Sequence, residues 1–200
     1  IVLNAMNIIA KGTLSTDALV VGLGKNLLID PEWMDGLANW SGPLQFYAPG
    51  DASGYANPAY PVAYMYSGAP GGGTLFGFAT PAKDDAGTKA LGCPVAPGET
   101  LIGSIYANAY RCSGQVYINY YDAAGSLIST IYGESTTQSF SASVPQDGWR
   151  RIKVKSTVPT GAVLARFSIR KTDTNTGEAN SYLFLWKPQL EKTNPHASEP

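Results

Sequence analysis

Short runs of alternating side chains are the feature that most restricts the fold of this 200-residue chain. In Leu101–Tyr110 and Gln115–Tyr121, mostly aliphatic residues alternate with tyrosine and asparagine. This pattern is typical of a strand, in which successive side chains face opposite sides of a sheet. The alternation returns in Leu127–Tyr132, Trp149–Lys155 and Ala162–Lys171. No segment shows a convincing helical period. The sequence therefore predicts an all-β fold, an antiparallel sandwich of the jelly-roll type.

The alternation also predicts which residues face the core. Asp122–Gly125 reads as the turn of a hairpin, and Asp147-Gly148 as another turn. Ser181–Trp186 is apolar on both faces, which predicts a central strand or one that meets a partner. The expected inner residues are Ile105, Ala107, Ala109, Val116, Ile118, Tyr120, Ile152, Val154, Val163, Ala165, Phe167 and Ile169.

The charge content excludes several classes of partner. Charged residues make up 14% of the chain and its net charge is −1. An average soluble domain has about 25% charged residues. We expect no nucleic acid as a partner, because duplex binding needs a positive excess. We also expect no membrane insertion, because no apolar run approaches the roughly 18 residues of a spanning helix.

The first 24 residues differ from the rest of the chain. Large apolar residues crowd this segment without a clear period, and leaving them in water would cost about 1.5–3 kcal/mol each. We therefore expect residues 1–24 to be a connector that buries these side chains against other chains, either helical or extended. The jelly roll is expected at 25–192 and a tail at 193–200. Because the chain begins at Ile1 and not at Met, we expect it to be a piece of a longer protein.

The two cysteines and the single histidine give no metal site. Cys93 and Cys112 are too few to hold zinc, and His196 lies in the expected tail. The cysteines are either two buried thiols or a pair that bridges neighbouring strand ends.

The first candidate binding residues lie on the polar sides of two strands. Tyrosine rings offer stacking surfaces and amides offer hydrogen bonds, which suits a sugar with an apolar face and hydroxyl edges. If the two strands are neighbours, these side chains share one patch. The alternative is packing against the second sheet or a trimer interface. The residues are Tyr106, Asn108, Tyr110, Tyr117, Asn119 and Tyr121.

Gly42–Gly73 supplies a second candidate. We expect long loops there with one or two short strands, because proline and glycine are frequent. Tyrosine-rich loop tips resemble antibody binding sites in composition, although the rings could instead fasten the loops to the sandwich. The residues are Tyr55, Tyr60, Tyr64 and Tyr66, with Asn57 and Asp51.

Basic residues and tryptophans complete the candidates. Arg151 and Arg166, with Lys153, Lys155 and Arg170, could line one face of two adjacent strands and meet an acidic polysaccharide. A solvated basic face is the alternative. The tryptophans are expected to be core or interface anchors more than ligand platforms. They are Trp33, Trp40, Trp149 and Trp186.

Catalysis has little support, so we expect a protein that is not an enzyme. No histidine is placed to activate a nucleophile. A glycosidase needs two carboxylates about 5–10 Å apart in a cleft, and no such pair is recognisable. The carboxylates not assigned to turns are Asp51, Asp84, Asp85 and Glu134.

Both ends of the chain resemble known modules. Asn26–Trp33, followed by Trp40, resembles the opening "NLL-x-(N/D)-P-x-(F/W) … W" of carbohydrate-binding-module-like jelly rolls. Ala10–Leu19 is similar to the connector before such modules in phage tail-tip and host-specificity proteins. A further set resembles the closing strands of the version in bacteriophage tail proteins: Trp149, Pro159–Ala162, Trp186–Glu191 and Ala197-Ser198.

This resemblance implies a function and partners. It implies glycan binding for the jelly roll and a homotrimer for a phage fibre, in the distal tail of the virion. The partners would be a bacterial surface polysaccharide or receptor, and other phage tail proteins on the N-terminal side. A structural spacer and a polysaccharide depolymerase are the alternatives.

The chain departs from the resemblance at the calcium position. Many such jelly rolls hold calcium with an acidic residue after the first aromatic and another on the final strand. Here those positions are Met34 and Phe184–Trp186. Asp30, Glu32 and Asp35 could supply oxygens instead, but they also suit a turn and a surface. We therefore expect no cofactor.

Overall fold

The computed structural model describes residues 26–28, 40–47, 61–67, 75–79, 92–138, 148–173 and 180–193. These ranges contain eleven strands and no helix, so the described part of the chain is all-β, as predicted. Within it, no helix is long and apolar enough to cross a membrane.

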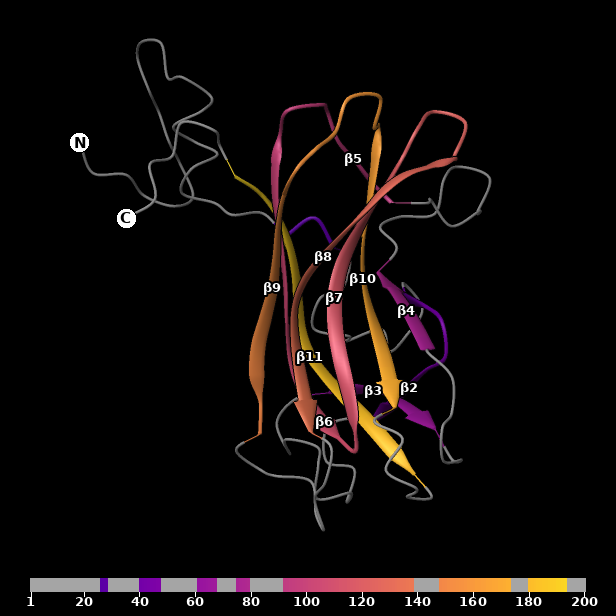
Figure 1. Ribbon diagram of the computed structural model, residues 1–200, viewed down its shortest axis with the longest axis vertical. Coiled ribbons are helices and arrows are strands. Elements are labelled where there is room, and N and C mark those ends of the chain that lie inside the picture. The colour runs from indigo at the N-terminus through magenta and orange to yellow at the C-terminus, as the bar shows by residue number, and fades with distance from the viewer. Residues whose placement is uncertain are drawn as a thin grey trace, which may run out of the picture.

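Two antiparallel sheets form the sandwich, and their strands run along the long axis of the molecule (Figure 1). The first sheet has the order β1-β4-β10-β7-β8, with β5 also paired to β10. Its strands are β1 (Trp40–Ser41), β4 (Leu75–Ala79), β5 (Cys93–Pro94), β7 (Cys112–Tyr121), β8 (Leu127–Gln138) and β10 (Leu164–Asp173).

The second sheet has the order β2-β3-β11-β6-β9. Between β6 and β11 the chain changes sheet at every connection except the β7–β8 hairpin. Sheets that exchange strands in this way form a jelly roll. The strands of this sheet are β2 (Leu44–Tyr47), β3 (Val62–Ser67), β6 (Thr100–Tyr110), β9 (Arg150–Thr157) and β11 (Ser181–Thr193).

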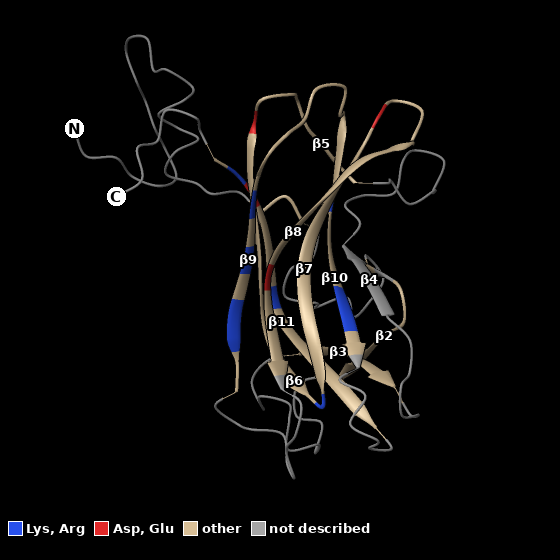
Figure 2. Ribbon diagram, viewed as in Figure 1, with Lys and Arg blue, Asp and Glu red and all other residues tan. Residues whose placement is uncertain are grey.

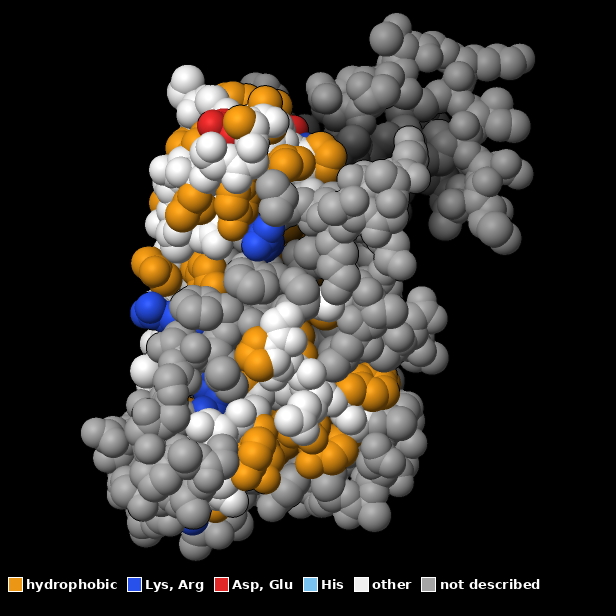
Figure 3. Space-filling model, turned by 90° about the vertical axis from the view of Figure 1, so that its right-hand side faces the viewer, with side chains coloured by type: hydrophobic (Ala, Val, Ile, Leu, Met, Phe, Trp, Pro, Cys, Tyr) orange, Lys and Arg blue, Asp and Glu red, His pale blue; other side chains and the backbone are white. Residues whose placement is uncertain are grey.

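The core lies between the sheets and contains the predicted inner residues. All of them are buried except Val163, which is 39% exposed. Val163 precedes β10, and its backbone bonds to Tyr121 and Val95 hold it at the end of the sandwich. Leu127 and Ile128 are also exposed. Figure 3 shows hydrophobic side chains on one side of the molecule, both at its upper end and lower down.

The β7–β8 hairpin forms where the sequence predicted it. One carboxylate oxygen of Asp122 accepts bonds from the backbone N–H groups of Ala124 (2.9 Å) and Ser126 (2.8 Å), and Gly125 adopts a positive φ of 80°. An Asp that bonds the backbone ahead of it is a common way to fix a tight turn. Strand β8 continues to Gln138, well beyond the predicted end at Tyr132.

Strand β8 also closes one edge of the sandwich against β9. A Cβ on Gly133 would lie 2.4 Å from the carbonyl oxygen of Lys153, so only glycine allows this approach. The pairing of β7 with β8 is irregular between Gln115 and Tyr117. Beside this irregularity, Glu134 turns to β9 and accepts the backbone N–H of Lys153 at 3.1 Å. The two sheets are therefore held together at this edge by the Glu134 side chain and by the close packing of β8 against β9.

An irregularity in β11 is filled by Asn26. The register shifts between Trp186 and Gln189, and Lys187 has a φ of 48°. The Asn26 amide donates to the carbonyl of Pro188 (2.9 Å) and accepts the N–H of Leu190 (2.9 Å). The two ends of the sequence resemblance therefore meet at this bulge, where an amide satisfies backbone groups that the sheet leaves unpaired.

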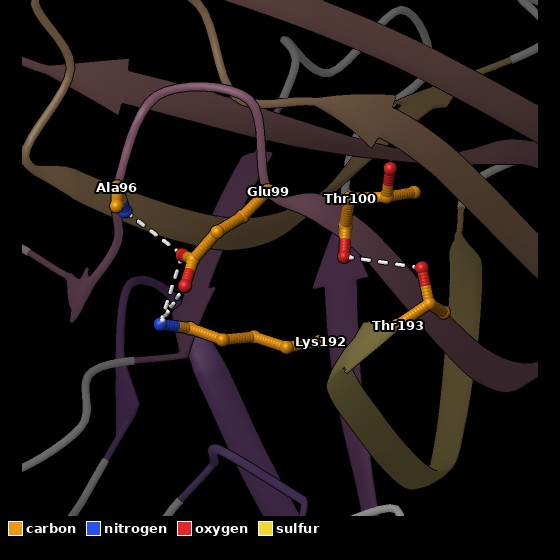
Figure 4. A network of polar contacts seen from close by, with 5 residues as sticks. All are labelled: Ala96, Glu99, Thr100, Lys192 and Thr193. Carbon is orange, nitrogen blue, oxygen red and sulfur yellow. Dashed lines mark hydrogen bonds and ion pairs between the residues drawn. The ribbon is translucent and has the colours of Figure 1, made fainter. Parts of the chain in front are cut away.

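Polar contacts also fix the end of β11 (Figure 4). The Lys192 ammonium lies 2.9 Å from a Glu99 carboxylate oxygen, which also accepts the N–H of Ala96 at 2.8 Å. The Thr193 hydroxyl donates to the carbonyl of Thr100 at 3.4 Å. The ion pair is partly exposed, so its contribution is small and it mainly holds the turn before β6 against β11.

The cysteines are two separate buried thiols. Cys93 donates to the carbonyl of Leu27 at 3.6 Å, and Cys112 donates to the carbonyl of Tyr182 at 3.1 Å. Cys93 pairs with Ala165 and Cys112 with Asp173, at opposite ends of β10, so the two thiols are too far apart for the bridge considered as an alternative.

Candidate functional site

Aromatic side chains cover much of the outer side of the second sheet. On β11 the inner residues are Leu183 and Leu185, so Tyr182, Phe184 and Trp186 lie on the outer side. Neighbouring strands add rings in register, for example Tyr66 opposite Tyr182. We call this surface the aromatic face: Tyr47, Tyr64, Tyr66, Tyr106, Tyr110, Trp149, Tyr182, Phe184 and Trp186.

One half of the aromatic face is a closely packed group of rings. Tyr47 stacks on Tyr64 with centroids 4.4 Å apart, and Tyr182 stacks on Phe184 at 5.6 Å. Tyr66 lies 4.9 Å from Tyr182 and is 38% exposed, whereas Phe184 is buried beneath its neighbours. Rings that pack on each other lose little freedom on binding, so the surface is preorganised.

The hydroxyl of Tyr64 is held as a neutral group. It donates to the Gln45 side-chain oxygen at 2.6 Å. Burial, and then the neighbouring Tyr47, raise the pKa of Tyr64 to about 12. The hydroxyl is therefore uncharged at physiological pH, and because its one proton is donated to Gln45 it can act toward a ligand as a hydrogen-bond acceptor.

The other half of the aromatic face centres on Trp186. Its ring lies 5.4 Å from that of Tyr106 and meets Trp149 edge-on at 6.4 Å. The Lys187 ammonium lies 4.6 Å from the Trp186 ring, and the Arg151 guanidinium lies 5.1 Å from the Tyr106 ring. These cations cover parts of the two rings. They lie at the border between the aromatic face and a charged part of the same surface.

A hollow of about 490 Å³ adjoins the aromatic face at Arg151. This volume is typical of sites for small ligands. Its walls carry two basic and two acidic side chains, and the Arg151 guanidinium donates to the Ser104 hydroxyl at 2.9 Å. Basic residues follow β9 beside it (Figure 2). The lining residues are Ile102, Ser104, Glu134, Arg151, Lys153, Gln189 and Glu191.

The aromatic face and the hollow together offer the groups that bind a sugar. Ring faces attract the C–H side of a pyranose, and planar amide, carboxylate and guanidinium groups bond its hydroxyls. Cation and anion are balanced in the hollow, so its charges do not select an anionic ligand.

The first set of sequence candidates does not form one patch. Tyr106, Asn108 and Tyr110 lie on β6, whereas Tyr117 and Asn119 lie on β7 in the other sheet, as does Tyr121. The two sets face opposite sides of the sandwich. The cause is Arg111, a single residue with a φ of 55° at which the chain passes from one sheet to the other.

Three members of that set are also buried. Asn108 is 2% exposed, Tyr117 3% and Asn119 8%, because neighbouring side chains cover them on their own outer surfaces. Asn119 accepts the Thr130 hydroxyl at 2.7 Å, for example. Tyr106 and Tyr110 remain on the aromatic face, and Tyr121 is half-buried on the opposite face. The first candidate is thus only partly accessible for binding.

The second set and the basic set also divide. Tyr64 and Tyr66 lie on strand β3 and not on a loop tip, because both pair with β11. Tyr55, Tyr60, Asn57 and Asp51 lie outside the described residues.

Strands β9 and β10 belong to different sheets, so the predicted basic face does not exist as one surface. Arg151, Lys153 and Lys155 lie on one side of the sandwich and Arg166 and Arg170 on the other.

The tryptophans divide in the same way. Trp40 is buried in the core as expected, whereas Trp149 and Trp186 lie on the aromatic face. Sequence reasoning did not assign Trp149, Trp186, Gln189 or Glu191 to a binding surface. For Trp186 the sequence did contain a signal. Trp186 alternates with Leu183 and Leu185 in the same way as Tyr182 and Phe184 do, so it lies on their side of the strand.

The described residues contain no group of three His, Cys, Asp or Glu side chains that could hold a metal ion. Asp30, Glu32 and Asp35, considered for calcium, lie outside the described residues. Glu134 lines the hollow, but one of its carboxylate oxygens accepts a backbone N–H from β9. This bond holds β8 against β9.

No protein-family model matches the chain, and no curated protein sequence matches it. Solved structures share its architecture. TmCBM61, solved in complex with β-1,4-galactotriose, is 13% identical with a TM-score of 0.50, over 84% of this chain and 99% of that one. The fold is a jelly roll of the carbohydrate-binding-module type.

Two larger proteins contain the same jelly-roll fold. One is the enzymatically active domain of bacteriophage CBA120 tailspike protein 4, at 11% identity and a TM-score of 0.53 over 84% of this chain. The other is the arabinose-bound MgGH51 α-L-arabinofuranosidase, at 16% identity and 0.54 over 86%. The present chain spans 21% and 27% of these two chains, respectively.

Proposed function

We propose that this chain is a non-enzymatic glycan-binding module that holds a sugar chain on its aromatic face and in the adjoining hollow. The observation that carries the proposal is the continuity of this surface. Trp186 contacts Tyr106, the Arg151 guanidinium lies over Tyr106, and Arg151 itself lines the hollow. A single oligosaccharide can therefore stack on rings at one unit and bond polar groups at the next.

The comparisons support a sugar ligand. The carbohydrate-binding module that shares the fold over nearly its whole length was solved with a bound galactotriose. Binding without catalysis fits the hollow, because one of its two carboxylates, that of Glu134, accepts the Lys153 backbone N–H and holds β8 against β9, which leaves Glu191 alone. A glycosidase needs one carboxyl group free to donate a proton and a second to attack or activate water.

The proposal also includes a biological setting for the module. The module serves in a bacteriophage tail fibre or tail tip, at the distal end of the virion, where it attaches to a bacterial surface polysaccharide or receptor. Support comes from the resemblance at Ala10–Leu19 and Trp186–Glu191, and from the fold shared with a phage tailspike domain. The apolar connector, residues 1–24, joins three copies and other tail proteins, and three weak sites gain by avidity.

Binding to defined polysaccharides tests the function. Affinity electrophoresis of the chain through gels with β-1,4-galactan, arabinan or purified bacterial O-antigen should show retardation by at least one polymer. Trp186→Ala should weaken that binding by about tenfold, because it removes the ring at the centre of the site. Leu127→Ala is the control, since Leu127 is 55% exposed at the end of β8 and away from the aromatic face.

The same experiment separates the alternatives. Retardation by none of the polymers would reject glycan binding and favour a structural spacer. Equal retardation of wild type and Trp186→Ala would place the ligand elsewhere. Release of reducing ends from a polymer would reject the non-enzymatic part of the proposal.

A further inference from the structure

The opposite outer surface of the sandwich carries a second, chemically different hollow. It has a volume of about 280 Å³ and crosses β7, β8 and β10 of the first sheet. Its walls are hydroxyl, amide and guanidinium groups. The lining residues are Ser113, Gln115, Ser135, Thr137, Arg170 and Thr172.

Arg170 is held over this hollow by two neighbours. Its Nη2 donates to the side-chain oxygen of Gln115, whose own amide donates to the carbonyl of Gly133 at 3.1 Å. The guanidinium also lies 4.7 Å from the ring of Tyr132, which is 54% exposed. A guanidinium has five N–H donors in one plane, and an ordered one is a preformed partner for a carboxylate.

A second guanidinium follows on the same strand. Arg166 lies 4.9 Å from the ring of Tyr121, on the same side of β10 as Arg170. Four residues along a strand separate these cations by about 13 Å. They suit a polymer whose charge repeats along its length better than a single small anion.

The charge of this surface is one-sided. Strand β7 has no charged residue, β8 has no basic residue, and β10 carries Arg166 and Arg170 on its outer side. Glu134 is the acidic residue of β8, and it turns to the other sheet. Figure 2 shows basic residues on β10 and none of either sign along β7. The surface is therefore complementary to an anion, unlike the balanced hollow opposite.

We propose that this second surface binds an acidic polysaccharide, with Arg166 and Arg170 each pairing with the carboxylate of a hexuronic-acid unit. The hydroxyl groups of Ser113, Ser135 and Thr137 bond the sugar hydroxyls, and the exposed Tyr132 ring packs on a pyranose face. The site goes beyond the proposed function, since it lies on the other sheet and selects a different class of glycan.

Polygalacturonate is the probe, with fully methyl-esterified polygalacturonate as its uncharged counterpart. The purified full chain should be retarded by polygalacturonate, and Arg166→Gln/Arg170→Gln should weaken this binding by about tenfold or more. Added salt should weaken it for the wild type and have less effect on the double variant. Arg166→Lys/Arg170→Lys keeps the charge but loses the planar fork, so its affinity should fall between the two.

Arg150→Gln/Lys155→Gln is the matched control. It removes two positive charges from exposed positions on β9, in the other sheet, and should bind polygalacturonate like the wild type. Far-ultraviolet circular dichroism and thermal unfolding confirm that each variant is folded. Trp186→Ala should leave polygalacturonate binding intact, so failure of the aromatic face and failure of this second surface are distinguishable.

Several outcomes would overturn the proposal. They are absence of binding to polygalacturonate, an equal loss in the β9 control, and unchanged affinity in Arg166→Gln/Arg170→Gln. Stronger retardation by heparin or duplex DNA than by polygalacturonate would also overturn it, because the surface would then respond to charge density and not to carboxylated sugar.

Discussion

Burial gives two weak acids of the described chain unusual pKa values. Burial raises the pKa of the Cys93 thiol from 9.0 to about 11 and that of the Tyr117 hydroxyl from 10.0 to about 12. For Cys93 the nearby Lys192 acts in the opposite direction, and for Tyr117 a bond to Ser168 does so, but burial is the larger cause in both. Both groups remain protonated in the native state at neutral pH.

These pKa values predict alkaline sensitivity. Between pH 9 and 12 the folded chain holds protons that the unfolded chain has released, so the free energy of unfolding falls as pH rises. Urea unfolding at several pH values should show full stability below about pH 9 and a progressive loss above it. Tyr117→Phe should show a shallower decline, and equal slopes for variant and wild type would contradict the assignment.

The sequence predicted well on which side of its strand each side chain lies. Ile105, Ala107 and Ala109 are in the core and Tyr106 is on the outside, because strict alternation is a local property. Accessibility could not be predicted in the same way. Asn108 faces outward yet is buried, since its exposure depends on side chains from strands distant in sequence.

At the level of elements, strand existence was predictable and strand pairing was not. The double-sided apolar pattern of Ser181–Trp186 indicated a central strand or one that meets a partner, and β11 is central, between β3 and β6. The hairpin at Asp122–Gly125 was also correct, because its turn is encoded locally. The passage from β6 to β7 through Arg111 looks like another tight connection, but it changes sheet. The candidate site was split for this reason.

The contact between β8 and β9 predicts a steric effect of a single methyl group. In Gly133→Ala the new Cβ would meet the Lys153 carbonyl and the Val154 Cβ at 2.5 Å or less, and the backbone has to move. We expect a loss of about 1–3 kcal/mol in the free energy of unfolding. Glycan binding in the hollow should also weaken, because Glu134 is adjacent.

Denaturant unfolding measures the effect of Gly133→Ala. Leu127→Ala on the same strand is the control, and since Leu127 is 55% exposed its effect should be clearly smaller than that of Gly133→Ala. A Gly133→Ala variant as stable as the wild type would show that β8 is free to separate from β9.

For the whole molecule, assembly is the property to test. Sedimentation of the full chain should give a homotrimer, and a variant that begins at Lys25 should give a folded monomer, because the apolar residues of 1–24 are what the trimer is proposed to bury. The trimer should also bind an immobilised glycan more tightly than the monomer by avidity. A full chain that sediments as a monomer would remove the trimer from the proposal.

The bond between Asn26 and the bulge in β11 has a mechanical consequence. Any tension on the chain ahead of Asn26 reaches the sandwich at Pro188 and Leu190, within its central strand. Beside this point β11 is hydrogen-bonded to β6 through Gln189–Thr193. Further along, at Ser181–Leu185, it is bonded to β3 as well, so the load enters through the β6 ladder and then reaches a second one. A tether attached at this point can be pulled without peeling an edge strand away.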